Sequence, residues 1–208
     1  MSICYCKSVG SKKGEANVAS ILAGLKWVEM NHRKYKIRIV NLSAGAGENL
    51  EPGKEKMLIE AVEHLWDLGL VVVVSSGNNG PGEGTIAIPG NSRKVITVGA
   101  VKTEKQRREL FGSRSYERMC SETGRNSTGY QIISCNSQIH GKKDAYTVKS
   151  GSSMATPVVS GAVALLMEKY PRITNVEVKL RLRETCIHLP GAGEQGWGML
   201  NIRDFLKL

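Results

Sequence analysis

The spacing of apolar residues along the chain predicts alternating helices and strands. In residues 15–32, five apolar side chains recur at the three- and four-residue intervals of a helix face: Val18, Ile21, Leu22, Leu25 and Val28. Residues 70–75 are apolar and mostly β-branched, which is typical of a strand buried on both faces. Strands are predicted over residues 3–6, 36–42, 70–75 and 94–101, and helices over 15–32, 54–68, 152–170 and 175–186.

The order of these elements predicts an α/β fold with a parallel sheet between helical layers. Residues 77–90 are rich in Gly and Pro and predict a loop, and Pro171 ends the preceding helix. With 208 residues, of which 41% are hydrophobic, the chain is long enough to bury one substantial core, so one domain over 1–208 is expected. No membrane-spanning run and no export signal is expected in these residues.

The formal net charge of +10 raises the question of a nucleic-acid partner. Basic side chains cluster in two places, at 102–108 and at 179–183. The few aromatic residues do not alternate with these basic runs, and no nucleic-acid-binding module is present. Solvated basic faces are therefore expected, without a specific nucleic-acid partner.

The five cysteines are an odd number, scattered over a chain that is too large to depend on disulfides. We expect reduced thiols, which favours a cytoplasmic location without establishing one. Cys4 and Cys6 lie two positions apart, but no second pair completes a metal-binding set. No metal site is predicted from these residues.

Residues 151–157, Gly-Ser-Ser-Met-Ala-Thr-Pro, place Ser153 at a glycine-led turn that opens an apolar helix. Gly151 allows close approach of the backbone, and the small side chains of Ser152 and Ala155 leave room for a substrate. The helix N-terminus directs unpaired N–H groups toward an anion beside Ser153. A serine is also a preferred N-cap residue, so a capped core helix is the alternative for this segment alone.

This segment resembles the nucleophile motif of the subtilisin-like serine proteases (subtilases, peptidase S8). Residues 71–80 are similar to the family's buried strand that ends in Gly-Asn, which implies that Asn78 is the oxyanion-hole donor. Residues 37–45 and 196–201 resemble two further family segments in the expected order. The resemblance implies a three-layer sandwich with a mostly parallel central sheet, and acyl transfer to Ser153 from a polypeptide substrate.

The resemblance also implies the walls of the primary specificity pocket. One edge would be Ser43, Ala44 and Gly45, and the other Ser75, Ser76 and Gly77, with Ser152 beside the nucleophile. Such small residues suit an extended peptide that adds alongside a strand. In the segment 124–129 only Gly129 agrees with the family pattern, and a loop is expected there.

The family's aspartate and histidine motifs are absent from these 208 residues. Both motifs would precede the segment that begins near Cys4, so we expect an N-terminally truncated domain. The missing N-terminal part would be a partner of this chain, and without that part we expect poor solubility. His140 is the one histidine beside a glycine, and a solvated loop position is expected for it. A calcium site is implied only by the family resemblance, and the loop that binds calcium in the family would lie mostly before Met1.

Three functions therefore stay open. The first is a serine-type endopeptidase with Ser153 and Asn78 in this chain and the aspartate and histidine upstream, inactive as this chain alone. The second is an inactive remnant or a peptide-binding pseudoprotease, since a fold does not guarantee chemistry. The third is a basic α/β module that binds nucleotides or nucleic acid, but the chain lacks the glycine-rich phosphate-binding motifs.

Overall fold

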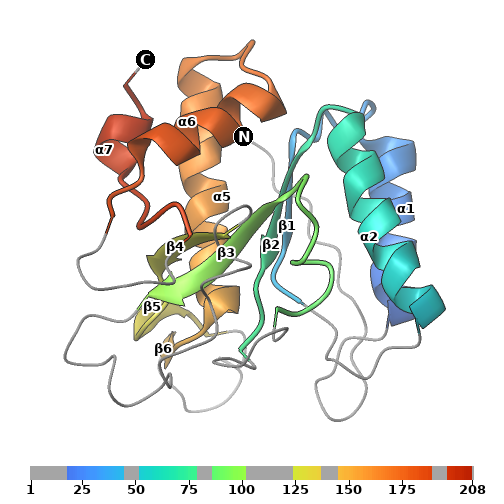
Figure 1. Ribbon diagram of the computed structural model, residues 1–208, viewed down its shortest axis with the longest axis horizontal. Helices are drawn as coiled ribbons and strands as arrows, with labels where there is room; N and C mark the ends of the chain where they lie inside the picture. The colour runs from blue at the N-terminus through green and yellow to red at the C-terminus, as the bar shows by residue number, and fades with distance from the viewer. Residues whose placement is uncertain are drawn as a thin grey trace.

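The computed structural model describes residues 18–44, 52–78, 86–101, 124–136, 145–188 and 196–207 (Figure 1). Four parallel strands form the central sheet in the order β1-β2-β3-β4. Their bounds are β1 Ile39–Leu42, β2 Val71–Ser75, β3 Ile96–Val101 and β4 Gly124–Thr128. A separate antiparallel ribbon consists of β5 Ile132–Cys135 and β6 Tyr146–Lys149.

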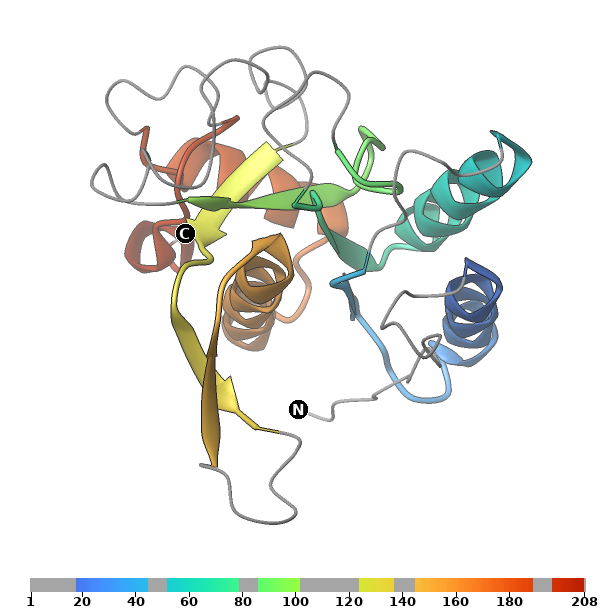
Figure 2. The ribbon, with the colours of Figure 1, turned by 90° about the horizontal axis from the view of Figure 1, so that it is seen from below.

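Helices cover both faces of the sheet. The bounds are α1 Val18–Asn31, α2 Pro52–Asp67, α5 Ser152–Lys169, α6 Asn175–Thr185 and α7 Ile202–Phe205. Figure 2 shows α5 on one side of the sheet and α6 with α7 on the other. The Asn175 side chain donates to the carbonyls of Trp66 and Leu70, which ties α6 to the end of α2. These layers are those of the predicted α/β sandwich.

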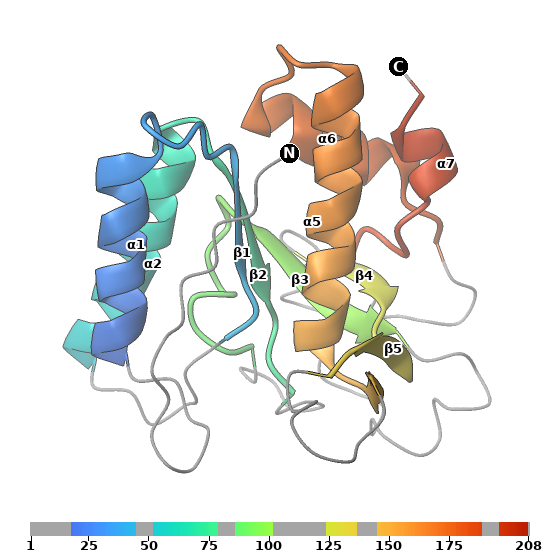
Figure 3. The same cartoon turned by 180° about the vertical axis from the view of Figure 1, so that it is seen from behind.

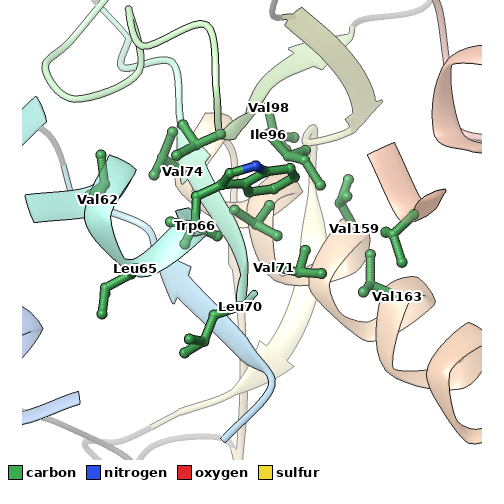
Figure 4. Close-up of a cluster of buried hydrophobic side chains, with 14 of the residues drawn as sticks. Val62, Leu65, Trp66, Leu70, Val71, Val74, Ile96, Val98, Val159 and Val163 are labelled. Atoms are coloured by element: carbon green, nitrogen blue, oxygen red, sulfur yellow. The ribbon is translucent and has the colours of Figure 1, made fainter. Parts of the chain in front are cut away.

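The core lies where β2 crosses between the two helical layers. Val71, Val72, Val73 and Val74 are fully buried, because side chains that alternate between the faces of β2 meet helices on both sides. Figure 4 shows Trp66 of α2 and Val159 and Val163 of α5 among the buried side chains around this strand. The continuous apolar run in the sequence is explained by this double coverage.

The predicted helices and the strands near residues 36–42, 70–75 and 94–101 are confirmed, with shorter bounds at several ends. The loop expected at 124–129 is wrong for residues 124–128, which form β4 and pair with β3 from Thr97–Gly124 to Val101–Thr128. The sequence Gly-Arg-Asn-Ser-Thr carries no apolar pattern, so backbone pairing to a neighbouring strand determines its conformation. The strand expected at 3–6 lies outside the described residues.

Among the described helices, none combines the length and the apolar character needed to cross a membrane.

Candidate active site

The carboxyl ends of two neighbouring strands and the start of α5 meet at one edge of the sheet. β1 leads into Ser43, β2 leads into Ser76, Gly77 and Asn78, and α5 begins at Ser152. Figure 3 shows the first turn of α5 at the lower end of the molecule, where β1 and β2 also end. In open parallel sheets this edge is the usual place for a binding site.

Two glycines allow the chain to enter α5 at this edge. The Gly151 N–H donates to the Gly129 carbonyl over 2.7 Å, and Gly151 has φ 139°, which L side chains rarely adopt. A methyl group on Gly129 would lie 2.5 Å from Ala100 Cβ and 2.8 Å from the Gly151 carbonyl oxygen. Gly151 is therefore required by its backbone conformation, and Gly129 by the lack of space for a side chain. The lack of space explains why Gly129 keeps the family pattern where its neighbours do not.

The N-cap of α5 is Gly151, which has no side chain that could cap the helix. The alternative of a serine-capped core helix is therefore wrong for Ser152 and Ser153. Their hydroxyl groups contact other segments instead.

Ser152 connects the start of α5 to Asn78. The Ser152 backbone N–H donates to Asn78 Oδ1 over 3.0 Å, and Ser152 Oγ lies 3.2 Å from the same oxygen. Ser152 Oγ also donates to the Gly77 carbonyl over 2.8 Å, and the side chain is buried. These contacts fix the oxygen end of the Asn78 amide, so its Nδ2 donor is the end that stays available.

At this edge, two N–H donors from different elements are among those without an acceptor in the described ranges. They are the Asn78 Nδ2 group and the backbone N–H of Ser153 in the first turn of α5. Unpaired donors at a helix start are suited to an oxygen that carries negative charge. The pair is the one that the sequence predicts for an oxyanion hole.

The Ser153 hydroxyl donates to the Ser43 carbonyl over 2.9 Å. A carbonyl oxygen cannot remove the proton of a hydroxyl, so this contact orients Ser153 without activating it. In the described part of the chain no histidine or carboxylate is bonded to Ser153. His32 bonds to the Glu29 carbonyl and His64 lies 3.6 Å from the Glu29 carboxylate, while His140 lies outside the described residues.

A polar network beside Ser153 was not predicted. Ser160 Oγ of α5 donates to Asn41 Oδ1 over 2.8 Å, and Asn41 Nδ2 donates to Ser43 Oγ over 2.9 Å. The only signal in the sequence is a polar residue, Asn41, within a strand of apolar ones. This network holds β1 to α5 and thereby places the Ser43 carbonyl against Ser153.

The predicted pocket walls are described in part. Ser43 and Ala44 are half-buried, and Gly45 lies outside the described residues. Ser75 and Ser76 are buried, and Gly77 has φ 84° with no room for a side chain beside Ala87. The geometry brings these residues to the same edge as Ser153, and their role as pocket walls stays a prediction.

Among the described residues, the side chains that could bind a metal ion or take part in redox chemistry are few and scattered. No group of three or more His, Cys, Asp or Glu side chains there is placed to hold a metal ion, so no calcium site is assigned to them. Cys135 is exposed and Cys186 is half-buried, while the other three cysteines lie outside the described residues.

Comparison with known proteins gives consistent matches over nearly the whole chain. A profile of the Subtilase family, Peptidase_S8, matches residues 2–198. Subtilisin DY from Bacillus licheniformis is 30% identical over 200 residues, covering 95% of this chain and 66% of that protein. The serine protease AprX from Bacillus subtilis (strain 168) is 34% identical over 199 residues, covering 83% of this chain and 44% of that protein.

Solved structures agree on the fold. The prenylagaramide maturation protease PagA matches with a TM-score of 0.74 at 19% identity, covering 96% of this chain and 70% of that one. Sphericase matches with a TM-score of 0.71 at 21% identity, covering 93% and 66% respectively. The chain thus spans between about half and two thirds of the length of the curated relatives that it matches.

Proposed function

Because the chain belongs to the subtilase family of serine-type peptidases, we propose that it carries the nucleophile and the oxyanion hole of a serine endopeptidase. Ser153 would attack the peptide carbonyl and form the acyl-enzyme. Asn78 Nδ2 and the Ser153 N–H would stabilise the negative charge that develops on the carbonyl oxygen. The observation that carries this proposal is that Asn78 Nδ2 and the Ser153 N–H, where the end of β2 meets the start of α5, have no acceptor within the described ranges.

Catalysis requires a base that accepts the Ser153 proton. The described part of the chain places none beside Ser153, whose hydroxyl donates to the Ser43 carbonyl. We therefore propose that the aspartate and histidine come from a segment upstream of these residues, and that this chain alone is inactive. The substrate would be a polypeptide in extended conformation beside β1.

Complementation in trans tests this proposal. The 208-residue chain is mixed with the segment of a subtilisin that carries the aspartate and histidine motifs, and hydrolysis of a fluorogenic peptide library is measured. We expect hydrolysis only in the mixture, and its loss in Ser153→Ala. Ser134→Ala removes an exposed serine of β5 that contacts none of the candidate site residues, so it serves as the control and should keep activity.

A second function is favoured by one observation, the Ser153 hydroxyl bonded to a carbonyl instead of a base. A protein of this fold can keep its peptide-binding edge without chemistry. In that case Ser153→Ala would bind peptides as tightly as the unchanged chain, and the complemented mixture would hydrolyse nothing. Hydrolysis by the complemented mixture separates the two functions, and fluorescence anisotropy with labelled peptides from the library measures whether the binding edge is kept.

A further inference from the structure

Basic and apolar side chains gather on the surface where α1 ends. We call this surface the α1-end patch and define it by its members: Trp27, Met30, Arg33, Lys34, Tyr35 and Lys36. Met30 is 74% exposed, Tyr35 46% and Trp27 39%. Trp27 and Met30 are three residues apart, so they share one face of the helix. Exposed large apolar side chains that cluster in this way mark an interaction surface more often than isolated ones do.

The two aromatic rings of the patch stack on each other. The ring centroids of Trp27 and Tyr35 are 5.5 Å apart with an interplanar angle of 22°. The Lys34 ammonium lies 5.3 Å from the centroid of the Tyr35 ring. The stack keeps both rings at the surface, with a cation beside them, instead of allowing them to fold into the core.

The cations of the patch form no ion pair with the part of the chain that the structure describes. Arg33, Lys34 and Lys36 are exposed, and within the described ranges none of them pairs with a carboxylate. Lys26, one helical turn earlier, does pair with Glu29 over 2.8 Å. The turn after α1 therefore presents three free positive charges around uncovered apolar groups.

Lys36 occupies a backbone position that disfavours a side chain. Its φ is 52°, in the left-handed region, and the Lys36 N–H donates to the Arg33 carbonyl as the chain leaves α1. Glycine is the usual residue at such a helix end, because it adopts this conformation without strain. A lysine there adds a charge to the patch at the expense of backbone stability.

The patch lies at the opposite end of the molecule from Ser153. The turn after α1 leads directly into the first residue of β1, so it is at the amino edge of the parallel sheet. Ser153 follows the carboxyl edge. Figure 3 shows the turn at the upper end of the view and the start of α5 at the lower end. A partner bound at the patch would leave the candidate active site open.

We infer that the α1-end patch binds the surface of an anionic phospholipid membrane. Protein surfaces that lie at the headgroup level of bilayers combine Trp, Tyr and long apolar side chains with flanking Lys and Arg, and the patch has this composition. Unpaired cations add attraction to anionic lipids. Single-stranded nucleic acid fits less well, because bases stack on free ring faces and here the two rings cover each other.

Vesicle flotation tests this inference with the full 208-residue chain. Vesicles of phosphatidylcholine with 30% phosphatidylserine are compared with pure phosphatidylcholine at low and at high salt. Bound protein floats, whereas aggregated protein sinks. We expect binding to the anionic vesicles only, weakened by salt because exposed charges are screened.

Variants locate the binding surface. Arg33→Gln, Lys34→Gln and Lys36→Gln together should weaken binding on the order of a hundredfold, from about fivefold per cation. Lys56→Gln, Lys149→Gln and Arg203→Gln remove the same charge from exposed positions elsewhere and should bind nearly as the unchanged chain does. Lys36→Gly should lower binding about fivefold and raise the melting temperature, which no misfolded variant would do.

The inference is wrong if neutral vesicles bind equally well, or if the two triple variants lose binding equally. It is also wrong if the chain binds a single-stranded oligonucleotide through the patch cations while no vesicle binds. Met30→Ser separates insertion from charge attraction alone, and we expect it to weaken binding several-fold without changing the salt dependence. Unchanged binding in Met30→Ser would contradict the interfacial arrangement.

Discussion

Ser152 shows how a single residue prepares the candidate site. Its hydroxyl and its backbone N–H both contact Asn78 Oδ1, and the hydroxyl also donates to the Gly77 carbonyl. The next serine, Ser153, is half-buried, and its hydroxyl donates to the Ser43 carbonyl. Adjacent serines in one motif thus have different roles, the first structural and the second chemical in our proposal.

We predict that Ser152→Ala lowers kcat of the complemented enzyme about three- to tenfold, the rate equivalent of one lost hydrogen bond. The backbone bond to Asn78 remains, so the effect is partial. Ser152→Thr keeps the hydroxyl and should restore most of kcat. If Ser152→Ala lowers only the melting temperature, and kcat at low temperature is unchanged, Ser152 does not position Asn78.

Asn78→Ala removes the Nδ2 donor and should lower kcat by about 10²–10³-fold with little change in KM, a range that is known for this donor in a subtilisin itself. The reason is that the donor binds charge that exists only in the transition state. Asn91→Ala, at another asparagine of a loop, is the matched control. Equal kcat in Asn78→Ala and the unchanged chain would exclude Asn78 from the oxyanion hole.

Gly129→Ala should destabilise the fold by about 1–3 kcal/mol, since its new methyl group would overlap the backbone of Gly151 and Cβ of Ala100. Denaturant unfolding of the complemented enzyme measures this. Gly161→Ala is the control, because a methyl group there meets nothing within 4 Å. It should be neutral or stabilising in the middle of α5.

At the scale of elements, α6 begins with a capping box that links stability to pH. Thr174 Oγ1 accepts from the Glu177 N–H, and the Thr174 N–H donates to the Glu177 carboxylate over 2.7 Å. The backbone N–H of Thr174, and then its hydroxyl, hold the pKa of Glu177 below its ordinary value. A lowered carboxyl pKa stabilises the folded state above the ordinary pKa, and this contribution is lost as the pH falls through the lowered value.

We predict that Thr174→Ala lowers the free energy of unfolding by about 1 kcal/mol at pH 7. In the unchanged chain, part of the stability should disappear as the pH falls from 5 toward 3, and Glu177→Gln should flatten this part of the curve. Unfolding of the complemented enzyme in denaturant at each pH gives the comparison. A pH dependence that is identical in Glu177→Gln would show that the capping box is not its origin.

The elements differ in how well the sequence predicts them. β2 and α5 are predictable because long apolar runs must be buried, and residues 71–74 and Val159 are fully buried. β4 is not predictable, because its five residues carry no apolar pattern and depend on pairing with β3. In the ribbon of β5 and β6, the apolar side chains of Ile133 and Val148 are exposed. Apolar residues in this ribbon therefore do not indicate which positions are buried.

The candidate site likewise has contacts that the sequence predicts and contacts that it does not predict. Ser153 and Asn78 were predicted from motifs, and the structure brings their segments together through Ser152. The contact between Asn41 and Ser160 was not, since the two residues are 119 positions apart and the resemblance of residues 37–45 to the family assigns no role to Asn41. Long-range polar contacts of this kind depend on the packing of β1 against α5, which no local pattern encodes.

At the scale of the whole molecule, one side is less covered than the rest. β1 is at the edge of the described sheet and pairs only with β2. Along α5, Met154, Val158 and Leu165 fall on one stripe at helical spacing, and Leu165 is 50% exposed. An open parallel edge beside an apolar helix face promotes association between chains.

We predict that the isolated chain elutes from a sizing column mostly as aggregates, and that Leu165→Glu increases the monomer fraction because it places a charge on the stripe. Val176→Glu changes an equally exposed apolar residue on α6 and should change the elution little. A clean monomer with one cooperative unfolding transition in the unchanged chain would contradict this. That result would also weaken the proposal that 1–208 is part of a larger domain.

The most direct test of the central claim is covalent labelling of Ser153 with a fluorophosphonate, followed by intact mass, in the chain complemented with the aspartate- and histidine-bearing segment. We predict one adduct per chain, which is absent in Ser153→Ala and retained in Ser134→Ala. An adduct that persists in Ser153→Ala, or no adduct in a mixture shown to contain the assembled complex, would contradict the assignment of Ser153 as the nucleophile.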